Sequence, residues 1–187
     1  MDQRTEVVFI TIALVLLVGI VAWLYFRYRQ SKLLRERFGP EYDRVVRKEG
    51  NVRRGESVLQ FREKKREALK IQPLSNASRL EFSSRWNSVQ AQFVDDPEGS
   101  VSKADGLVNE LMEACGYPMT NFEERADVIS VDHPLVVENY RAAHGIAVSR
   151  SRGQATTEGL RKAMVHYRNL FDELLHEPQS KGKEVRA

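Results

Sequence analysis

One short stretch of the chain gathers the side chains that are best suited to chemistry. The stretch comprises Glu138, Asn139, Tyr140, Arg141 and His144, within two turns of a predicted helix. In a cleft between helices, such groups could hold a small ligand or move a proton. The structural alternative is an exposed helix face with one buried tyrosine whose hydroxyl finds a carboxylate. The sequence favours this alternative and leaves open a binding surface for a small ligand or a partner protein.

The other reactive residue types are spaced for structure rather than for catalysis. Asp95 and Asp96 precede Pro97, and an aspartate before a proline-initiated helix is a favoured cap for free backbone N–H groups. We interpret the segment Asp132–Pro134 in the same way. Cys115 ends an apolar stripe and is interpreted as part of the core. Phosphate-binding glycine loops, the nucleophile elbow and the paired-histidine zinc motif are absent from the sequence.

The histidines and the single cysteine do not predict a metal site. His133 and His144 are about three helical turns apart, which separates them by about 16 Å along one helix. His166 lies elsewhere in the chain, and Cys115 alone can form neither an intrachain disulfide nor a four-thiolate zinc site. We therefore expect no metal, no cofactor and no catalytic residue, and a non-enzymatic role is favoured.

The segment Val7–Phe26 is predicted to cross a membrane. It contains no charged residue over 20 positions, and a helix of that length crosses a bilayer core of about 30 Å. A cleaved signal peptide would have a basic start, a shorter apolar run and small residues at a cleavage site. This chain instead begins with Asp2, Arg4 and Glu6, so the spanning helix is favoured.

Charge on the two flanks predicts the orientation of this segment. The carboxyl-terminal flank is rich in basic residues, whereas Arg4 alone marks the other flank. Positively charged flanks remain in the cytoplasm, so we expect a single-pass protein of the inner membrane with its N-terminus outside and its C-terminal domain cytoplasmic. Aromatic and basic side chains favour the headgroup layer. The predicted interface anchors are Trp23, Tyr25, Arg27, Tyr28 and Arg29.

Basic and acidic residues are unevenly distributed beyond the membrane segment. Residues 27–70 contain 15 Lys and Arg against 7 Asp and Glu, whereas residues 71–187 contain 13 against 17. We expect the basic stretch to lie at anionic inner-leaflet headgroups and the acidic part to stand away from them. A nucleic-acid arm would require stacking aromatics or a basic groove, and Phe61 alone is weak support, so we expect no nucleic-acid partner.

Helical patterns predict an all-α fold with a basic helical connector and a bundle of about five helices. Gly39-Pro40 predicts a break, followed by a short helix at 41–48, a weakened region at Gly50-Asn51 and Gly55, and a helix at 56–70. The bundle helices are expected at about 75–94, 97–115, 120–130, from 135 to a loop at 149–153, and 156–175. The third should begin with a capping box formed by Thr120 and Glu123, and the last should be central.

Together these features divide the chain into five parts. The expected divisions are a tail at 1–6, the membrane helix at 7–26, the connector at 27–70, the bundle at 71–176 and a disordered tail at 177–187.

Three segments of the bundle carry a resemblance to a known family. They are FVDDP at 93–97, SVDHP at 130–134 leading into VENYRAAH at 137–144, and ATTE at 155–158 leading into AMVHYR at 163–168. Over roughly 38–175 the chain resembles an uncharacterised bacterial family of short proteins that are membrane-anchored or described as secreted. The resemblance implies no activity, substrate or cofactor. Gly159 departs from it, because relatives have an acidic residue there that completes a capping box with Thr156.

The favoured function is a non-enzymatic, membrane-tethered helical module that binds a protein partner or itself at the cytoplasmic face. The alternative is an enzymatic or ligand-binding domain that uses Glu138, Tyr140, Arg141 and His144. A third possibility is an envelope protein whose domain lies outside the cytoplasm. This would require an exception to the rule that positively charged flanks of a membrane helix stay in the cytoplasm.

Overall fold

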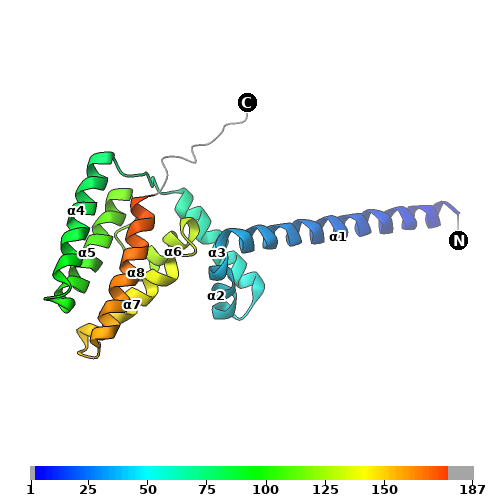
Figure 1. Cartoon of the computed structure of the whole chain (residues 1–187). Coiled ribbons are helices and arrows are strands. Elements are labelled where there is room, and N and C mark those ends of the chain that lie inside the picture. The colour runs from blue at the N-terminus through cyan, green and yellow to red at the C-terminus, as the bar shows by residue number, and fades with distance from the viewer. Residues whose placement is uncertain (1–2, 177–187) are drawn as a thin grey trace. The chain divides into compact units, whose positions relative to one another are not determined.

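Helices account for all the regular structure in the part of the chain that the structure describes. The computed structural model describes residues 3–176, with side chains from Ile12 onward except that of Ser151 (Figure 1). The helices are α1 Gln3–Phe38, α2 Pro40–Glu49, α3 Val52–Glu67, α4 Asn76–Gln92, α5 Pro97–Cys115, α6 Phe122–Asp132, α7 Val137–Ser151 and α8 Thr157–Leu175. The predicted all-α class is confirmed. The predicted disordered tail at 177–187 lies outside the described residues.

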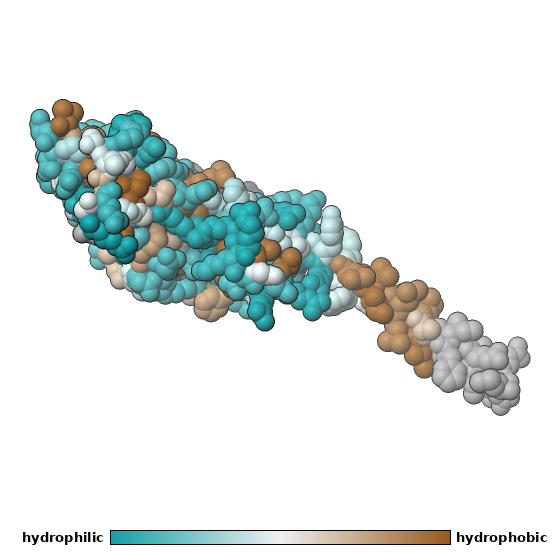
Figure 2. Space-filling view, turned by 90° about the horizontal axis from the view of Figure 1, so that it is seen from below, coloured by the Kyte–Doolittle hydropathy of each residue, from teal (hydrophilic) through white to brown (hydrophobic). Residues whose placement is uncertain are grey.

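Helix α1 is long and apolar enough to cross a membrane. Its candidate span is Ile12–Phe38, and the apolar window within it has no buried residue. Figure 2 shows this stretch as a continuous hydrophobic surface on the helix. Large side chains such as Leu16 and Phe26 are about two-thirds exposed, at 62% and 65%. A signal sequence near an N-terminus passes the same test of length and composition, so α1 is one candidate membrane helix among the described residues.

The chain divides into two compact units, Met1–Leu59 and Gln60–Ala187. Helix α3 is continuous from Val52 to Glu67, so the boundary between the units falls inside it. Our predicted division at Ile71 stays a prediction.

In the first unit, α2 and the beginning of α3 fold against the end of α1. The break at Gly39-Pro40 is confirmed, with Gly39 at φ 48° and α2 beginning at Pro40. The Tyr42 hydroxyl lies 3.3 Å from Ser31 Oγ on α1 and donates a 2.9 Å hydrogen bond to Glu56 Oε1 on α3. One tyrosine of α2 therefore connects all three helices. The buried apolar side chains of this unit are Leu34, Phe38, Tyr42, Val45 and Leu59.

The predicted start of α3 is wrong. We expected Gly55 to weaken regularity and the helix to begin at Glu56, but it begins at Val52. The Asn51 carboxamide explains this early start, because its Oδ1 accepts hydrogen bonds from the backbone N–H groups of Arg53 and Arg54. The helix also ends at Glu67, short of the predicted Lys70.

Gly55 lies where α3 approaches the backbone of α2 closely. A Cβ placed on Gly55 would be 2.9 Å from both Cα and Cγ2 of Val46, closer than real carbon contacts. The missing side chain thus permits tight packing of the two helices, which offsets the low helix propensity of glycine.

We expect the substitution Gly55→Ala to destabilise the α2–α3 packing by about 1–3 kcal/mol, because the new methyl group displaces backbone rather than a flexible side chain. Gly145→Ala is the matched control. Gly145 also lies inside a helix, but nothing is within 4 Å of its Cβ position, so alanine should stabilise α7 by about 0.5–1 kcal/mol. Hydrogen exchange of the α2, α3 and α7 amides measures both effects. Equal responses of the two variants would contradict the packing role of Gly55.

The second unit contains a bundle of α4, α5, α7 and α8, with α6 beside α7. Helix α8 packs against both α7 and α5, and α4 packs against α5 (Figure 1). Helix α8 has a continuous stripe of buried side chains. Its residues are Leu160, Ala163, Met164, Tyr167, Leu170, Phe171, Leu174 and Leu175. Trp86 of α4 stacks on Phe171 of α8, with 4.6 Å between ring centroids.

Three predicted helix boundaries of the bundle are confirmed by their caps. Asp96 accepts a 2.8 Å hydrogen bond from the backbone N–H of Gly99 at the start of α5. Gly116 ends that helix with φ 91°. Thr156 Oγ1 accepts from the backbone N–H of Gly159 at 3.1 Å, so α8 is capped although Gly159 carries no acidic side chain.

Two caps predicted for the bundle are wrong. Asn121, not Thr120, caps α6, because its Oδ1 accepts a 2.9 Å hydrogen bond from the backbone N–H of Glu124. The N-cap is therefore one residue later than expected, and the Glu124 carboxylate pairs with Lys65. Asp132 does not cap α7 but is the last residue of α6, and α7 begins after Val136 without a side-chain cap.

Two predicted ends in this region are also wrong. Helix α6 runs past the expected end at Ser130 to Asp132. Helix α7 continues to Ser151, into the loop expected at 149–153.

Candidate functional site

Helix α7 carries the five predicted site residues and directs them toward different neighbours. Tyr140 is fully buried. Its hydroxyl accepts a hydrogen bond from Arg125 Nε on α6 at 3.2 Å and donates to Asn109 Oδ1 on α5 at 3.4 Å. The phenol of Tyr140 therefore belongs to the interior of the bundle.

Asn139 and Arg141 flank Tyr140 and face different helices. Asn139 Oδ1 lies 2.8 Å from His166 Nδ1 on α8. Arg141 Nη2 lies 4.0 Å from Asp127 Oδ1 on α6, and its side chain is 13% exposed. These two residues thus connect α7 to two separate helices.

His144 is used in an aromatic stack. Its ring lies parallel to that of Phe122 on α6, with 3.7 Å between centroids and 8° between planes. Phe122 also contacts Tyr140 at 4.7 Å. Glu138 differs from the other four predicted residues because it is exposed and has no described side-chain partner. The five side chains therefore do not converge on a shared point, and their role in binding stays a prediction.

A chain of polar side chains runs through the bundle, and the sequence analysis selected only one of them, Tyr140, as a site residue. Tyr167, fully buried on α8, donates a 2.7 Å hydrogen bond to Asp105 Oδ1 on α5. Asn109 Nδ2 donates to the other oxygen of that carboxylate at 3.4 Å, and Asn109 Oδ1 accepts from Tyr140. Arg125 completes the chain by donating to the Tyr140 hydroxyl. Four helices are thus linked by polar contacts that connect two buried phenols to three half-buried side chains.

Sequence reasoning expected one buried tyrosine that donates to a carboxylate, and placed it at position 140. The structure gives that arrangement to Tyr167, whereas Tyr140 donates to an amide. Asp105 and Asn109 were missed. Their spacing of four residues beside the apolar residues of α5 was the available signal, because polar groups at the edge of a buried stripe need partners.

Burial also changes the acid–base behaviour of the two tyrosines. Burial raises the pKa of Tyr167 far above its ordinary value of 10.0, and the charge and hydrogen bond of Asp105 act in the same direction. Burial raises the pKa of Tyr140 as well, although the Arg125 guanidinium opposes the rise. Both phenols stay protonated, so they serve as hydrogen-bond donors.

We expect stability to fall as the pH rises above 10. Below pH 10 the folded and unfolded chains both retain the Tyr167 proton, whereas above it only the folded chain does. Stability is therefore lost by about 1.4 kcal/mol per pH unit for each such tyrosine. Tyr167→Phe should make the free energy of unfolding fall less steeply with pH above 10. At neutral pH it should lower that free energy by about 1 kcal/mol, because the hydrogen bond to Asp105 is lost.

Urea denaturation of the full chain in detergent, at about pH 8 and pH 11, measures this slope. The double variant Tyr140→Phe/Tyr167→Phe should have a smaller slope than the single variant. An unchanged slope in both variants would contradict the buried, protonated state of these phenols.

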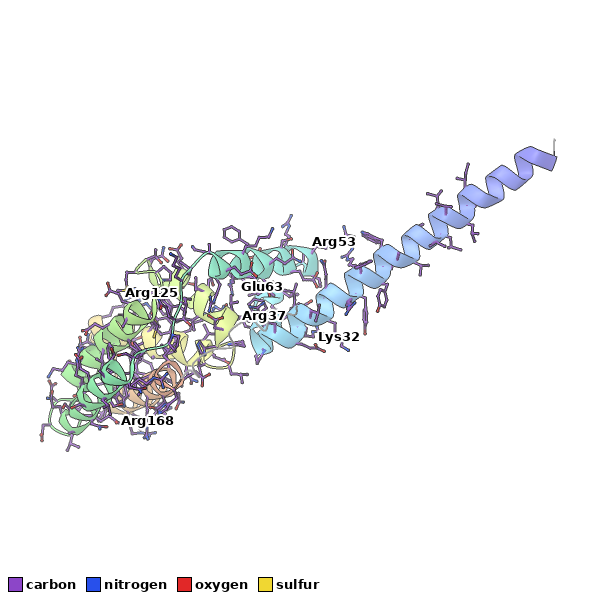
Figure 3. The ribbon with its side chains drawn as sticks, turned by 90° about the horizontal axis from the view of Figure 1, so that it is seen from above. Lys32, Arg37, Arg53, Glu63, Arg125 and Arg168 are labelled. Atoms are coloured by element: carbon purple, nitrogen blue, oxygen red, sulfur yellow. The ribbon has the colours of Figure 1, made fainter. Side chains whose placement is uncertain are left out.

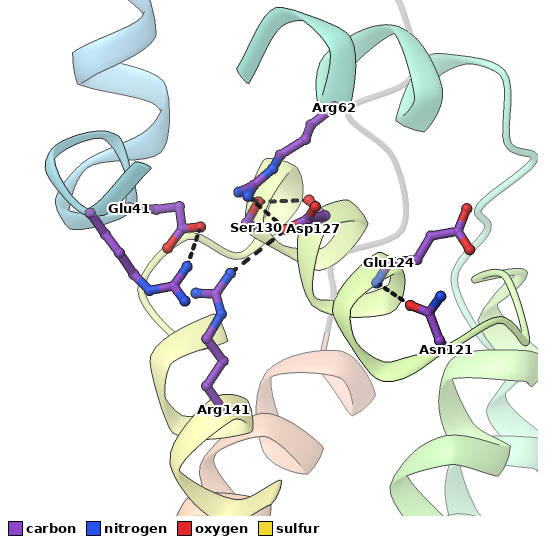
Figure 4. Close-up of polar contacts among 8 residues, drawn as sticks. Glu41, Arg62, Asn121, Glu124, Asp127, Ser130 and Arg141 are labelled. Carbon is purple, nitrogen blue, oxygen red and sulfur yellow. Dashed lines mark hydrogen bonds and ion pairs between the residues drawn. The ribbon is translucent and has the colours of Figure 1, made fainter. Parts of the chain in front are cut away.

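A second polar cluster joins the later half of α3 to α6 (Figure 4). Arg62 is buried, and its Nη2 lies 2.6 Å from Asp127 Oδ1. Its Nη1 donates a 3.1 Å hydrogen bond to Ser130 Oγ. Because Arg141 approaches the same carboxylate oxygen from α7, Asp127 lies between two guanidinium groups. The Arg62 side chain is only 6% exposed, whereas that of Asp127 is 36% exposed. Loss of the carboxylate would therefore be costly, because it would leave the buried guanidinium without this partner.

Two further ion pairs extend this contact. Lys65 pairs with Glu124, and Arg66 Nε donates to Asp132 Oδ2 at 2.5 Å. The Tyr117 hydroxyl also approaches Asp132, at 3.4 Å. Part of the basic charge that we expected to face lipid is therefore paired with the acidic side chains of α6.

The bundle also has an open groove between α4 and α5. Arg85 Nη2 donates to Glu110 Oε2 at 2.5 Å there. The lining residues are Arg85, Ser88, Val89, Lys103, Gly106, Leu107 and Glu110. None of the five predicted site residues on α7 lines this groove. Among the described residues, no group of three His, Cys, Asp or Glu side chains could hold a metal ion.

The predicted interface anchors lie near the carboxyl-terminal end of the apolar part of α1. Trp23, Tyr25 and Tyr28 are all more than half exposed. The Arg27 guanidinium lies over the Trp23 ring, 5.4 Å from its centroid, which is a cation–π contact. Exposed aromatics and arginines at one end of an apolar helix match the composition of a membrane interface.

No family model, curated protein or solved structure matches this chain. The resemblance to the bacterial family of short anchored proteins therefore stays a prediction.

Proposed function

We propose that this chain is a single-pass membrane protein whose helical bundle binds a protein partner, or a second copy of itself, at the cytoplasmic face of the inner membrane. Catalysis is not part of the proposal. The observation that carries it is the divergence of the polar side chains on α7. Four of the five are engaged with other helices, and Glu138 alone is exposed with no described partner.

Catalysis and tight ligand binding both require polar groups that converge on one point. In this bundle, Asn139 points to α8, Arg141 to α6 and Tyr140 to the core between α5 and α6. These contacts fix the relative positions of the helices, which favours a rigid surface over a reactive cleft. Rigid helical surfaces suit recognition by another protein.

The membrane part of the proposal depends on α1. Its apolar stretch is unburied, and exposed aromatic side chains cluster at the end that leads into the basic residues. The charge of the flanks supports an orientation with the bundle in the cytoplasm. Anionic headgroups of the inner leaflet are the lipid partner that suits this charge.

A reporter that is active only on one side of the membrane tests the orientation. We expect a cytoplasm-active reporter fused after Leu175 to be active and a periplasm-active one to be silent. A version in which Arg27, Arg29 and Lys32 become glutamine should lose this preference, because those charges hold the flank inside. The reverse pattern in the unmodified chain would contradict the orientation and favour an envelope protein.

Photo-crosslinking in intact membranes tests the binding of a partner. A photoreactive amino acid at position 138 should give one recurring crosslinked product, because Glu138 is the exposed one of the five predicted site residues on α7. The same amino acid at Glu113 is the matched control, since that glutamate is also exposed but lies at the far end of α5. Equal products at both positions, or none at either, would contradict a specific partner at α7. Capture of a small molecule by the purified chain would instead favour the ligand-binding alternative.

A further inference from the structure

Four exposed basic residues surround the turn between α2 and α3. They are Arg47 and Lys48 at the end of α2, and Arg53 and Arg54 at the start of α3. We name these four residues, with the turn Gly50-Asn51 between them, the α2–α3 tip. One acidic residue, Glu49, lies within it, and the first turn of α3 has none. The tip is therefore a concentrated positive surface of the first unit.

The fold of the first unit brings the tip back toward the apolar part of α1. The Tyr42 hydroxyl lies 3.3 Å from Ser31 Oγ and 2.9 Å from Glu56 Oε1, so the first turns of α3 lie beside Ser31. Arg53 precedes Glu56 by about one helical turn. Figure 3 shows Arg53 at the end of α3 that is nearer to the apolar part of α1.

This return shortens the distance between the tip and the predicted bilayer surface. Ser31 is five residues beyond Phe26, which corresponds to about 7.5 Å along α1. A straight helix would instead carry Arg53 about 40 Å from Phe26. The headgroup layer is about 5–7 Å thick, and charges interact over about 8 Å at physiological salt. Extended arginine side chains at the tip therefore reach anionic headgroups.

The surroundings of the tip also favour lipid over other anionic partners. Val52, beside Arg53, is 48% exposed, and Leu33 on α1 is 57% exposed. Apolar side chains among arginines suit the boundary between headgroups and hydrocarbon. Three of the four basic residues in the later half of α3 differ, because Arg62, Lys65 and Arg66 are paired with carboxylates of α6.

We propose that the α2–α3 tip binds the headgroups of acidic phospholipids, so that the first unit lies against the membrane as a folded basic platform. This inference rests on the proposed membrane anchoring through α1. It adds that Arg53 and Arg54, which are distant from the membrane segment in sequence, are lipid contacts. The binding surface is created by the hairpin of α2 and α3 rather than by a linear basic tail.

The test uses the full chain in nanodiscs of phosphatidylcholine, alone or mixed with phosphatidylglycerol. A fluorophore at Val52→Cys reports proximity to a quencher on the lipid headgroups, and one at Ala22→Cys reports the position of α1. Cys115, which is fully buried, is replaced by alanine in both. We expect headgroup quenching at position 52 to appear with phosphatidylglycerol and to be lost in Arg53→Gln/Arg54→Gln.

A matched control removes two exposed basic residues elsewhere, as Arg152→Gln/Lys162→Gln, and should retain the quenching. Equal loss in the control, or no dependence on phosphatidylglycerol, would overturn the proposal. If added RNA, rather than lipid, changed the fluorescence of the label at position 52, the tip would be a nucleic-acid contact. That outcome would also overturn the proposal. If the label at position 22 lies in hydrocarbon and the label at position 52 is not quenched, only the lipid-binding inference is overturned. A label at position 22 exposed to water defeats the anchoring itself.

Discussion

The distribution of positive charge along α3 is the constraint on which much of this structure depends. The later half of the helix places Arg62, Lys65 and Arg66 against three carboxylates of α6, and Arg62 is buried in doing so. A buried guanidinium is tolerated only with such partners. The first half carries Arg53 and Arg54 exposed at the α2–α3 tip. In one continuous helix, three basic side chains are thus paired with carboxylates, whereas Arg53 and Arg54 at the other end are exposed.

Inside the bundle, buried polar groups also have partners, but these contacts are hydrogen bonds in which at least one group is neutral. Two buried phenols link α8, α5, α7 and α6 through Asp105, Asn109 and Arg125. A satisfied polar chain of this kind favours one arrangement of the helices over shifted alternatives, because any shift would leave a buried donor or acceptor without a partner. Contacts between helices therefore account for four of the five polar residues of α7, and Glu138 is the exposed one.

Both proposals include the membrane anchoring through α1, but they concern different surfaces. Lipid binding by the α2–α3 tip concerns exposed arginines of the first unit, whereas partner binding concerns the α7 surface of the second. A membrane-anchored module that has both would hold its first unit at the lipid surface while the bundle remains free to recognise a protein. Each part is tested by its own variants.

The sequence by itself determined the apolar helix, the break at Gly39-Pro40, the caps at Asp96 and Thr156, and the buried stripe of α8. These features depend on local backbone chemistry and on the helical repeat, both of which are written in consecutive residues. Tertiary structure decided the rest. The carboxylate partner of Tyr167 is 62 positions away, the partners of α3 lie on α6, and Gly55 is explained only by its closeness to Val46. Contacts between residues distant in the chain leave no periodic signal, so one sequence does not reveal them.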